Sequence, residues 1–149
     1  MNSNLNSLFL EATCNVFQLM LDLTDISNSP VESFQCDDEL DISIGVTGDL
    51  VGAVIYRFPN PTSLNMVHIM SGMEIEIVDE FVTSAVSEIA NIISGNVLTM
   101  LAANDLKCDI LPPVLGEPDE DKEYSLRSAC CISTSVGDAF LDIRLNPAG

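Results

Sequence analysis

A glutamate and an asparagine stand three positions apart in the stretch SEIANIISGN, at Glu88 and Asn91. Residues with this spacing on a helix have neighbouring side chains. The carboxylate of Glu88 accepts hydrogen bonds, whereas the carboxamide of Asn91 both donates and accepts them. The pair therefore offers one charged acceptor and one neutral amide at a single place on a helix surface.

The polar residues around this pair have short side chains: Ser84, Ser87, Ser94 and Gly95. An exposed helix that needs only solubility more naturally carries several Glu or Lys residues, which form helices better than Ser or Gly. We therefore interpret this nearly uncharged side as a partner-binding surface that another molecule approaches closely. In the alternative interpretation, the small face packs against a neighbouring helix of the same protein, and Asn91 caps a local group.

The apolar pattern predicts that this stretch belongs to a long helix over residues 81–101. At about 100° per residue, the large apolar side chains fall on one broad side of the helix, opposite the pair. Asp79 and Glu80 supply an N-cap and an acidic first turn. The predicted buried stripe consists of Phe81, Val82, Ala85, Val86, Ile89, Ile92, Ile93, Val97 and Met100.

The rest of the chain contains one more long helix and two hairpins. Apolar residues at helical spacing predict a helix over 5–23, which is ended by turn-forming residues up to Pro30. Alternating apolar residues predict strands over 40–46 and 50–58, joined by a turn at 47–49. The elements expected after these are a short helix ending near Gly72, an extended link over 73–80, a strand ending at Pro112, an acidic solvated loop over 116–125 and a hairpin that turns at Gly137 and Asp138.

The two hairpins are similar to each other. Each turns at Gly-Asp, carries an arginine late in its second strand, at Arg57 and Arg144, and finishes at Asn-Pro. Each also follows a long helix, so we interpret the chain as an internal duplication of one helix plus antiparallel strands. Chance similarity is the alternative, because Gly-Asp turns are common in hairpins. Strands without regular β-α-β alternation indicate an α+β fold, with the long helices packed on one antiparallel sheet.

The composition indicates a single globular domain over residues 1–149. Apolar residues make up 47% of the chain, which favours either a large core or a surface covered by a second subunit. The net charge of −18 makes binding to nucleic acids or anionic membranes unfavourable. We expect a cytoplasmic protein, because no signal peptide and no membrane-spanning apolar run is visible. Five scattered cysteines and a single histidine, His68, predict no metal site.

The helix motif, together with the hairpins and the ILPP stretch, resembles the signature of the CheC/CheX family of chemotaxis phosphatases. In that signature an Asp or Ser is followed by Glu and then by Asn, a pattern that Ser84, Glu88 and Asn91 match in spacing. The proline that follows in the family pattern is represented by Pro112 or Pro113, slightly closer to Asn91 than the pattern has it. The resemblance implies a CheC-like fold with a catalytic centre at Glu88 and Asn91.

The first long helix lacks this motif, since Glu11 is followed three positions later by Cys14, and Asn15 is one residue out of phase. One residue turns a helical side chain by about 100°. The sequence is therefore similar to the CheX branch of the family, in which each chain has one active centre and two chains form a homodimer.

The resemblance also implies a function. The substrate would be the phosphoaspartate of a CheY-like response regulator, and Mg²⁺ would be bound by that regulator, so the chain needs no cofactor of its own. Phosphoryl transfer to water depends mostly on positioning and electrostatics. Asn91 would orient the attacking water, and Glu88 would anchor a lysine of the regulator. Two alternatives stay open: a dimeric module that binds a receiver domain or signalling partner without hydrolysis, and a small-molecule sensor.

Overall fold

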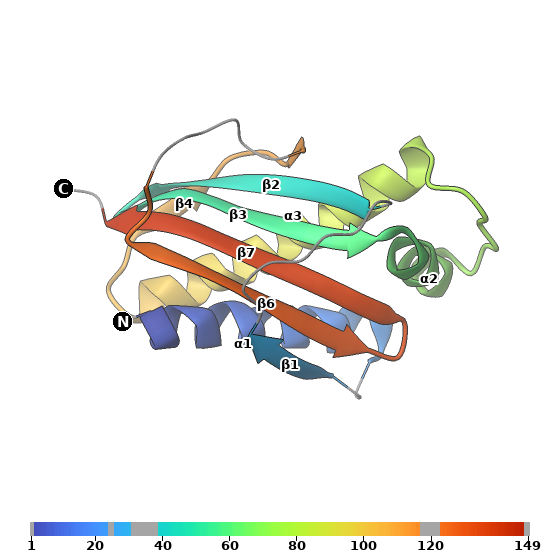
Figure 1. Cartoon of the computed structure of the whole chain (residues 1–149), viewed down its shortest axis with the longest axis horizontal. Coiled ribbons are helices and arrows are strands. Elements are labelled where there is room, and N and C mark those ends of the chain that lie inside the picture. Colours follow the sequence, from blue (N-terminus) through green and yellow to red (C-terminus); the bar gives the residue numbers. More distant parts are fainter. Residues whose placement is uncertain (1, 24–25, 31–38, 117–122, 148–149) are drawn as a thin grey trace.

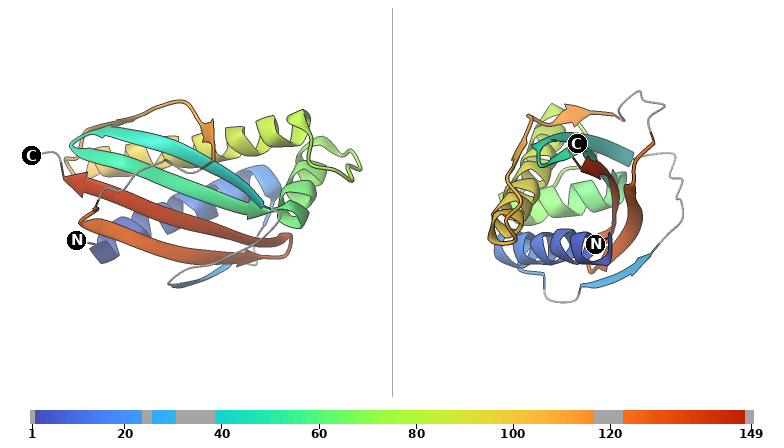
Figure 2. Two further views of the ribbon diagram at one scale, coloured as in Figure 1. Left: turned by 45° about the horizontal axis from the view of Figure 1, so that its top comes forward. Right: turned by 90° about the vertical axis from the view of Figure 1, so that its left-hand side faces the viewer.

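Three helices cover one face of a seven-stranded antiparallel sheet in the computed structural model of the protein (Figure 1). The structure describes residues 2–23, 26–30, 39–116 and 123–147, so most of the acidic loop predicted over 116–125 lies outside the described residues. Figure 2 shows the helices as one layer beside the sheet, which confirms the predicted α+β fold. The helices are α1 (Asn2–Leu21), α2 (Asn60–Ser71) and α3 (Glu80–Ala103). The strands are β1 (Ser27–Pro30), β2 (Glu39–Gly48), β3 (Leu50–Pro59), β4 (Cys108–Ile110), β5 (Val114–Leu115), β6 (Leu126–Thr134) and β7 (Gly137–Pro147).

The strand order places the two predicted hairpins next to each other. It runs β1-β6-β7-β3-β2-β4, and the short β5 pairs with β2. The hairpins β2–β3 and β6–β7 meet at the central β3–β7 pair, where Ala53 is opposite Arg144. A short strand from the other half of the chain lies outside each hairpin, because β1 pairs with β6 and β4 pairs with β2. This exchange gives the sheet the two-fold arrangement expected of an internal duplication.

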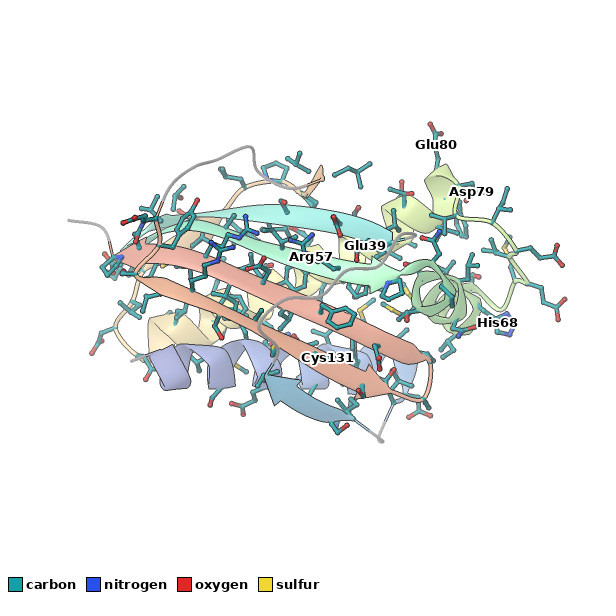
Figure 3. All side chains as sticks on the ribbon, in the orientation of Figure 1. Glu39, Arg57, His68, Asp79, Glu80 and Cys131 are labelled. Carbon is teal, nitrogen blue, oxygen red and sulfur yellow. The ribbon has the colours of Figure 1, made fainter. Side chains whose placement is uncertain are left out.

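The two arginines of the repeated hairpins meet on the sheet face turned away from the helices. Arg57 and Arg144 both bind the carboxylate of Asp142, at N–O distances of 3.3 and 2.8 Å. Arg57 also contacts Asp41 at 3.0 Å and Glu39 at 3.9 Å, and Figure 3 shows Glu39 beside Arg57 on this face. The two arginine side chains are 10% and 13% exposed, so salt screens these pairs less than surface pairs. The ion pairs connect β2, β3 and β7.

The apolar core lies between the sheet and the helices. Alternate residues of β2 and β3 point toward the helices, as the period of a strand requires, and Ile42, Ile44, Val54 and Tyr56 are at most 1% exposed. Full burial of one such aliphatic side chain contributes about 1.5–3 kcal/mol. The longest helix, α3, contacts α1, α2, β2 and β4. Among the described residues it is also the one helix long and apolar enough to span a membrane, a property that buried core helices share.

The segment that follows α1 is more regular than predicted. The sequence favours turns up to Pro30, but the residues of β1 pair with β6 in antiparallel register. The outer edge of β6 presents unpaired backbone groups, and pairing of this kind overrides local turn propensity. The prediction of a turn is therefore wrong for these four residues.

The second hairpin turns at residues 135–136, two positions earlier than the predicted Gly137 and Asp138, because Thr134 and Gly137 already pair across β6 and β7. Gly137 has a φ of +129°, and a Cβ at this position would clash with the side chain of Thr62 in α2. Glycine is therefore required here for its backbone conformation and for the close approach of α2.

Replacing Ser63 with alanine is expected to stabilise the protein by up to about 1 kcal/mol. Ser63 is 0% exposed in α2, and its hydroxyl has no hydrogen-bond partner among the described residues. The folded state therefore carries the desolvation cost of that hydroxyl, which alanine removes. The adjacent Thr62 is the control, because its hydroxyl donates to the carbonyl of Asp138 at 2.9 Å, and Thr62→Val should destabilise. Urea unfolding of both variants checks the prediction, which a loss of stability in Ser63→Ala would contradict.

Candidate functional site

The candidate site lies on α3, and Asp79 caps the start of this helix as predicted. The Asp79 side chain accepts a hydrogen bond from the backbone N–H of Val82 at 3.1 Å, and its carbonyl accepts one from Thr83 at 2.9 Å. Glu80 adds a negative charge to the first turn, where it interacts favourably with the helix dipole. These contacts fix where the helix begins, and the core fixes which side of it is buried.

The buried side of α3 includes Val82, Val86, Ile89 and Ile93, all 0% exposed. These four residues follow one another at helical spacing, as the predicted stripe requires. On the other side, the predicted site residues are exposed (Ser84 and Glu88) or partly exposed (Ser87, Asn91 and Gly95).

The side chains of Glu88 and Asn91 make no hydrogen bond or ion pair within the part of the chain that the structure describes. Glu88 is also the only charged residue of α3 after its first turn. A Cβ added at Gly95, one turn beyond Asn91, would meet no atom within 4 Å. No described group is therefore capped by Asn91, and the carboxylate and the carboxamide are available to another molecule.

Ser94 does not belong to this exposed side, so the prediction that it contacts a partner is wrong. It is 3% exposed, and its hydroxyl shares a 2.8 Å hydrogen bond with the hydroxyl of Tyr56 on β3. Ser94 is about 60° around the helix from Asn91, at the border of the polar side, so a polar group on the sheet decides its direction. Burial raises the pKa of Tyr56 above its usual range, so this hydroxyl stays protonated.

Phe81 was assigned to the buried stripe, but its side chain is 48% exposed. Glu88 is seven positions further along the helix, which is nearly two full turns, so the side chains of Phe81 and Glu88 point in directions about 20° apart. The exposed side of α3 therefore begins with an aromatic residue in its first turn and continues through Ser84 and Glu88 to Asn91.

Changing Tyr56 to phenylalanine is expected to cost about 1–2 kcal/mol of stability, because the Ser94 hydroxyl then stays buried without its partner. In a cycle with Ser94→Ala, the double variant should recover part of this loss, giving a coupling energy near 1 kcal/mol. Urea unfolding of the four proteins measures the coupling. Strictly additive losses would mean that the two hydroxyls contribute independently.

The corresponding helix α1 lacks a matching pair. Glu11 is exposed, whereas Cys14 and Asn15 are partly buried. Burial and, to a smaller extent, the carboxylate of Glu11 raise the pKa of the Cys14 thiol, so it stays protonated and poorly nucleophilic. No group of three or more His, Cys, Asp or Glu side chains suited to a metal ion occurs among the described residues.

A cavity that sequence reasoning missed lies on the face of the sheet opposite the helices. It has a volume of about 400 Å³ and lies between β2, β3 and the segment around Pro112. Its lining includes the alternate residues Ser43, Gly45 and Ala53, whereas their neighbours on the strands face the helices. The apolar residues beside the two prolines were the only sequence signal for it. This cavity is separated from Glu88 and Asn91 by the sheet.

Comparisons with known proteins identify the family to which the chain is related. The family described as Chemotaxis phosphatase CheX matches residues 42–133, which include most of β2 and all of β3 and α3. The CheY-P phosphatase CheX of Thermotoga maritima is 34% identical over 88 residues, 58% of this chain and 57% of that protein. The match therefore spans little more than half the length of this relative.

Solved structures of other proteins share the fold, and two of them illustrate the similarity. The chemotaxis protein CheX from Vibrio vulnificus aligns with a TM-score of 0.82 at 22% identity, over 96% of this chain and 99% of that one. CheX in the CheX-CheY-BeF3-Mg²⁺ complex from Borrelia burgdorferi aligns with a TM-score of 0.76 at 21% identity, over 94% and 96%. Since the family pattern covers more than half of the chain and includes the Glu88–Asn91 helix, the protein belongs to the chemotaxis phosphatase CheX family.

Proposed function

We propose that the protein hydrolyses the phosphoaspartate of a CheY-like response regulator in chemotaxis or two-component signalling. The observation that carries the proposal is the Glu88–Asn91 pair, which has no partner in the described chain and stands on a nearly uncharged helix face. Membership of the CheX family supports the proposal, as does the similarity to a protein named CheY-P phosphatase. The related CheX bound to CheY, BeF3 and Mg²⁺ supports the class of partner. In that complex, BeF3 stands in for a phosphoryl group.

In the proposed mechanism, Asn91 orients the water that attacks the phosphorus atom. Its amide oxygen accepts a hydrogen bond from this water, while its N–H donates to a phosphoryl oxygen. A new P–O bond forms to water, and the bond to the aspartyl oxygen breaks, which leaves inorganic phosphate and a free aspartate on the regulator. A neutral amide suits this position because it does not repel the phosphoryl group. The metal that neutralises the phosphoryl charge belongs to the regulator, so the contribution of this chain is positioning.

Glu88 has a different role in the proposal. Its carboxylate forms a charge-assisted hydrogen bond with a lysine of the regulator beside the phosphoryl group, and this bond holds the two proteins in register. Ser84, Ser87 and Gly95 have small side chains or none, so the surface around the pair is low: none of these three residues projects beyond Asn91 and prevents it from reaching the phosphoryl group.

Replacing Glu88 with alanine is therefore expected to raise KM for the phosphorylated regulator roughly 10-fold and to change kcat little, because the anchor acts in docking. Glu11→Ala is the matched control, since Glu11 is also an exposed glutamate on a long helix but has no asparagine three residues later. Steady-state phosphate release over a range of regulator concentrations separates the two constants. A selective loss of kcat in Glu88→Ala would assign the carboxylate to the chemical step instead.

We also propose that the protein acts in the cytoplasm as a homodimer. Three of the exposed large apolar side chains lie at the β4–β5 side of the sheet, and a second chain joined at a sheet edge would cover such residues. They are Leu111, Val114 and Leu115, at 51%, 63% and 59% exposure. Sedimentation equilibrium should give twice the mass of one chain, and the mass of a single chain would contradict the dimer.

The test of the function is direct. Purified receiver domains charged with acetyl phosphate are mixed with the protein, and the release of inorganic phosphate is followed over time. The proposal predicts that at least one CheY-like receiver loses its phosphoryl group much faster with the protein than alone. Binding to phosphorylated receivers without faster release would instead identify a docking module that does not catalyse hydrolysis.

A further inference from the structure

Residues 69–81, which comprise the end of α2, the link to α3 and the start of α3, expose a large share of the apolar surface. Ten large apolar side chains are exposed in the described part of the chain, and five of them lie within residues 69–81. Their exposed fractions range from 36% to 69%, and the residues are Ile69, Met70, Met73, Ile77 and Phe81. Large apolar side chains gathered on a surface mark sites of interaction with other molecules.

The same segment is acidic. Glu74, Glu76, Asp79 and Glu80 are all exposed, and the segment contains neither lysine nor arginine. Figure 3 shows Asp79 and Glu80 at the end of the molecule where this segment lies. A second copy of this protein is a poor occupant, because it would place carboxylates against carboxylates. The chemistry fits a partner with a surface that is both apolar and basic.

The fold holds this segment in place at both ends. Gly72 ends α2 in the left-handed conformation, and its N–H donates to the carbonyl of His68 at 2.8 Å. The His68 ring is also within 2.9 Å of the carbonyl of Met73. Between this end and the start of α3, Ile75 and Val78 pack against the core. The exposed apolar residues are therefore presented on a fixed backbone, which lowers the entropy lost on binding.

The segment is continuous with the candidate site. Phe81, Ser84, Glu88 and Asn91 follow one another at helical spacing along the exposed side of α3, and a rise of 1.5 Å per residue places Phe81 about 10 Å along the axis from Glu88. A folded domain that contacts Asn91 extends well beyond this distance. Phe81 is about 15 Å along the axis from Asn91, so a folded domain that contacts Asn91 and extends toward the start of α3 also reaches Phe81.

We propose that residues 69–81 are the docking surface for the phosphorylated receiver, an inference that rests on the proposed function. Ile77 and Phe81 contact an apolar strip of the receiver, and the four carboxylates face lysine or arginine side chains near its phosphorylation site. The apolar contacts supply affinity that salt does not screen, whereas the carboxylates speed association. The attraction between these carboxylates and basic side chains of the receiver offsets the repulsion between a chain of net charge −18 and an anionic phosphoryl group.

The test compares two pairs of variants for binding and for turnover. Ile77→Ala combined with Phe81→Ala is expected to raise the Kd for a BeF3-activated receiver, and KM for phosphate release, by about 30-fold or more, with kcat at saturation within about twofold of wild type. Val51→Ala is the control, because Val51 is 44% exposed outside this segment. An unchanged Kd in the double variant would overturn the proposal. Circular dichroism confirms that Phe81→Ala remains folded, and Ile77→Ala alone, at a residue 69% exposed, should still raise Kd several-fold.

A second pair tests the charges. Glu74→Gln with Glu76→Gln should flatten the dependence of the association rate on salt, whereas Asp105→Asn with Asp109→Asn, which are also exposed, should not. Equal slopes in the two pairs would contradict the electrostatic part of the proposal. Failure of the proposed function has a different signature, since wild-type protein would then bind the BeF3-activated receiver but would not accelerate phosphate release from the phosphorylated receiver. In that case a raised Kd in the Ile77 and Phe81 double variant would still support docking at this surface.

Discussion

Replacing Asn91 with alanine is expected to lower kcat for phosphoaspartate hydrolysis by at least about 100-fold. The free energy of unfolding should stay within about 0.5 kcal/mol of wild type, because the Asn91 side chain is partly exposed and has no partner within the described chain. The attacking water loses the group that orients it, and no other side chain on this face replaces a carboxamide. Binding of the regulator should change little, since the anchor at Glu88 and the bare surface remain.

Two further variants make this prediction specific. Asn91→Asp keeps the size of the side chain but replaces the N–H donor with a negative charge, so it should be as inactive as alanine. Asn96→Ala is the matched control, because Asn96 is also a partly exposed asparagine of α3 but points about 140° away from Asn91. Single-turnover phosphate release and urea unfolding measure the two quantities. Turnover at the wild-type rate in Asn91→Ala would remove the proposed mechanism.

Periodicity in the sequence predicted most of the fold because the core has two simple repeats. Alternation in β2 and β3 places Ile42, Ile44 and Val54 on one face, and the helical stripe of α3 places Val86 and Ile93 toward them. Capping by Asp79 was also predicted, since an N-cap depends on residues close in sequence. Local patterns of this kind require no knowledge of distant contacts.

The errors arise where distant residues decide the outcome. Ser94 was predicted to lie on the exposed face, but its hydroxyl is buried because it bonds to the hydroxyl of Tyr56, 38 residues away. β1 forms because the edge of β6 is available, and its own residues favour turns. The repeated arginines were predicted as equivalent positions, but their shared carboxylate, Asp142, follows from the pairing of β3 with β7. A single sequence contains none of these long-range relations.

Substitutions at Gly95 are expected to raise stability, and a long side chain at this position is also expected to lower activity. Gly95 lies one turn beyond Asn91, and its position has open space for a side chain. Alanine and glutamine are both better helix formers than glycine, so each variant should gain about 0.5–1 kcal/mol of stability. Gly95→Ala adds one methyl group and should keep most of the phosphatase activity. Gly95→Gln places a long, uncharged side chain beside Asn91, and phosphate release should fall at least about 10-fold, because a displacement of 1 Å at a reacting centre already has effects of this size or larger.

The comparison depends on side-chain length, because the two substituents are both uncharged and both favour the helix. Thermal unfolding measures the shared gain in stability, and phosphate release from a charged regulator measures the difference in activity. Should Gly95→Gln release phosphate as fast as Gly95→Ala, the regulator would not approach this turn of α3 closely, and the small residues around Asn91 would need another explanation. If only the longer side chain blocks the reaction, the low surface is required because the phosphoryl group must reach the amide of Asn91.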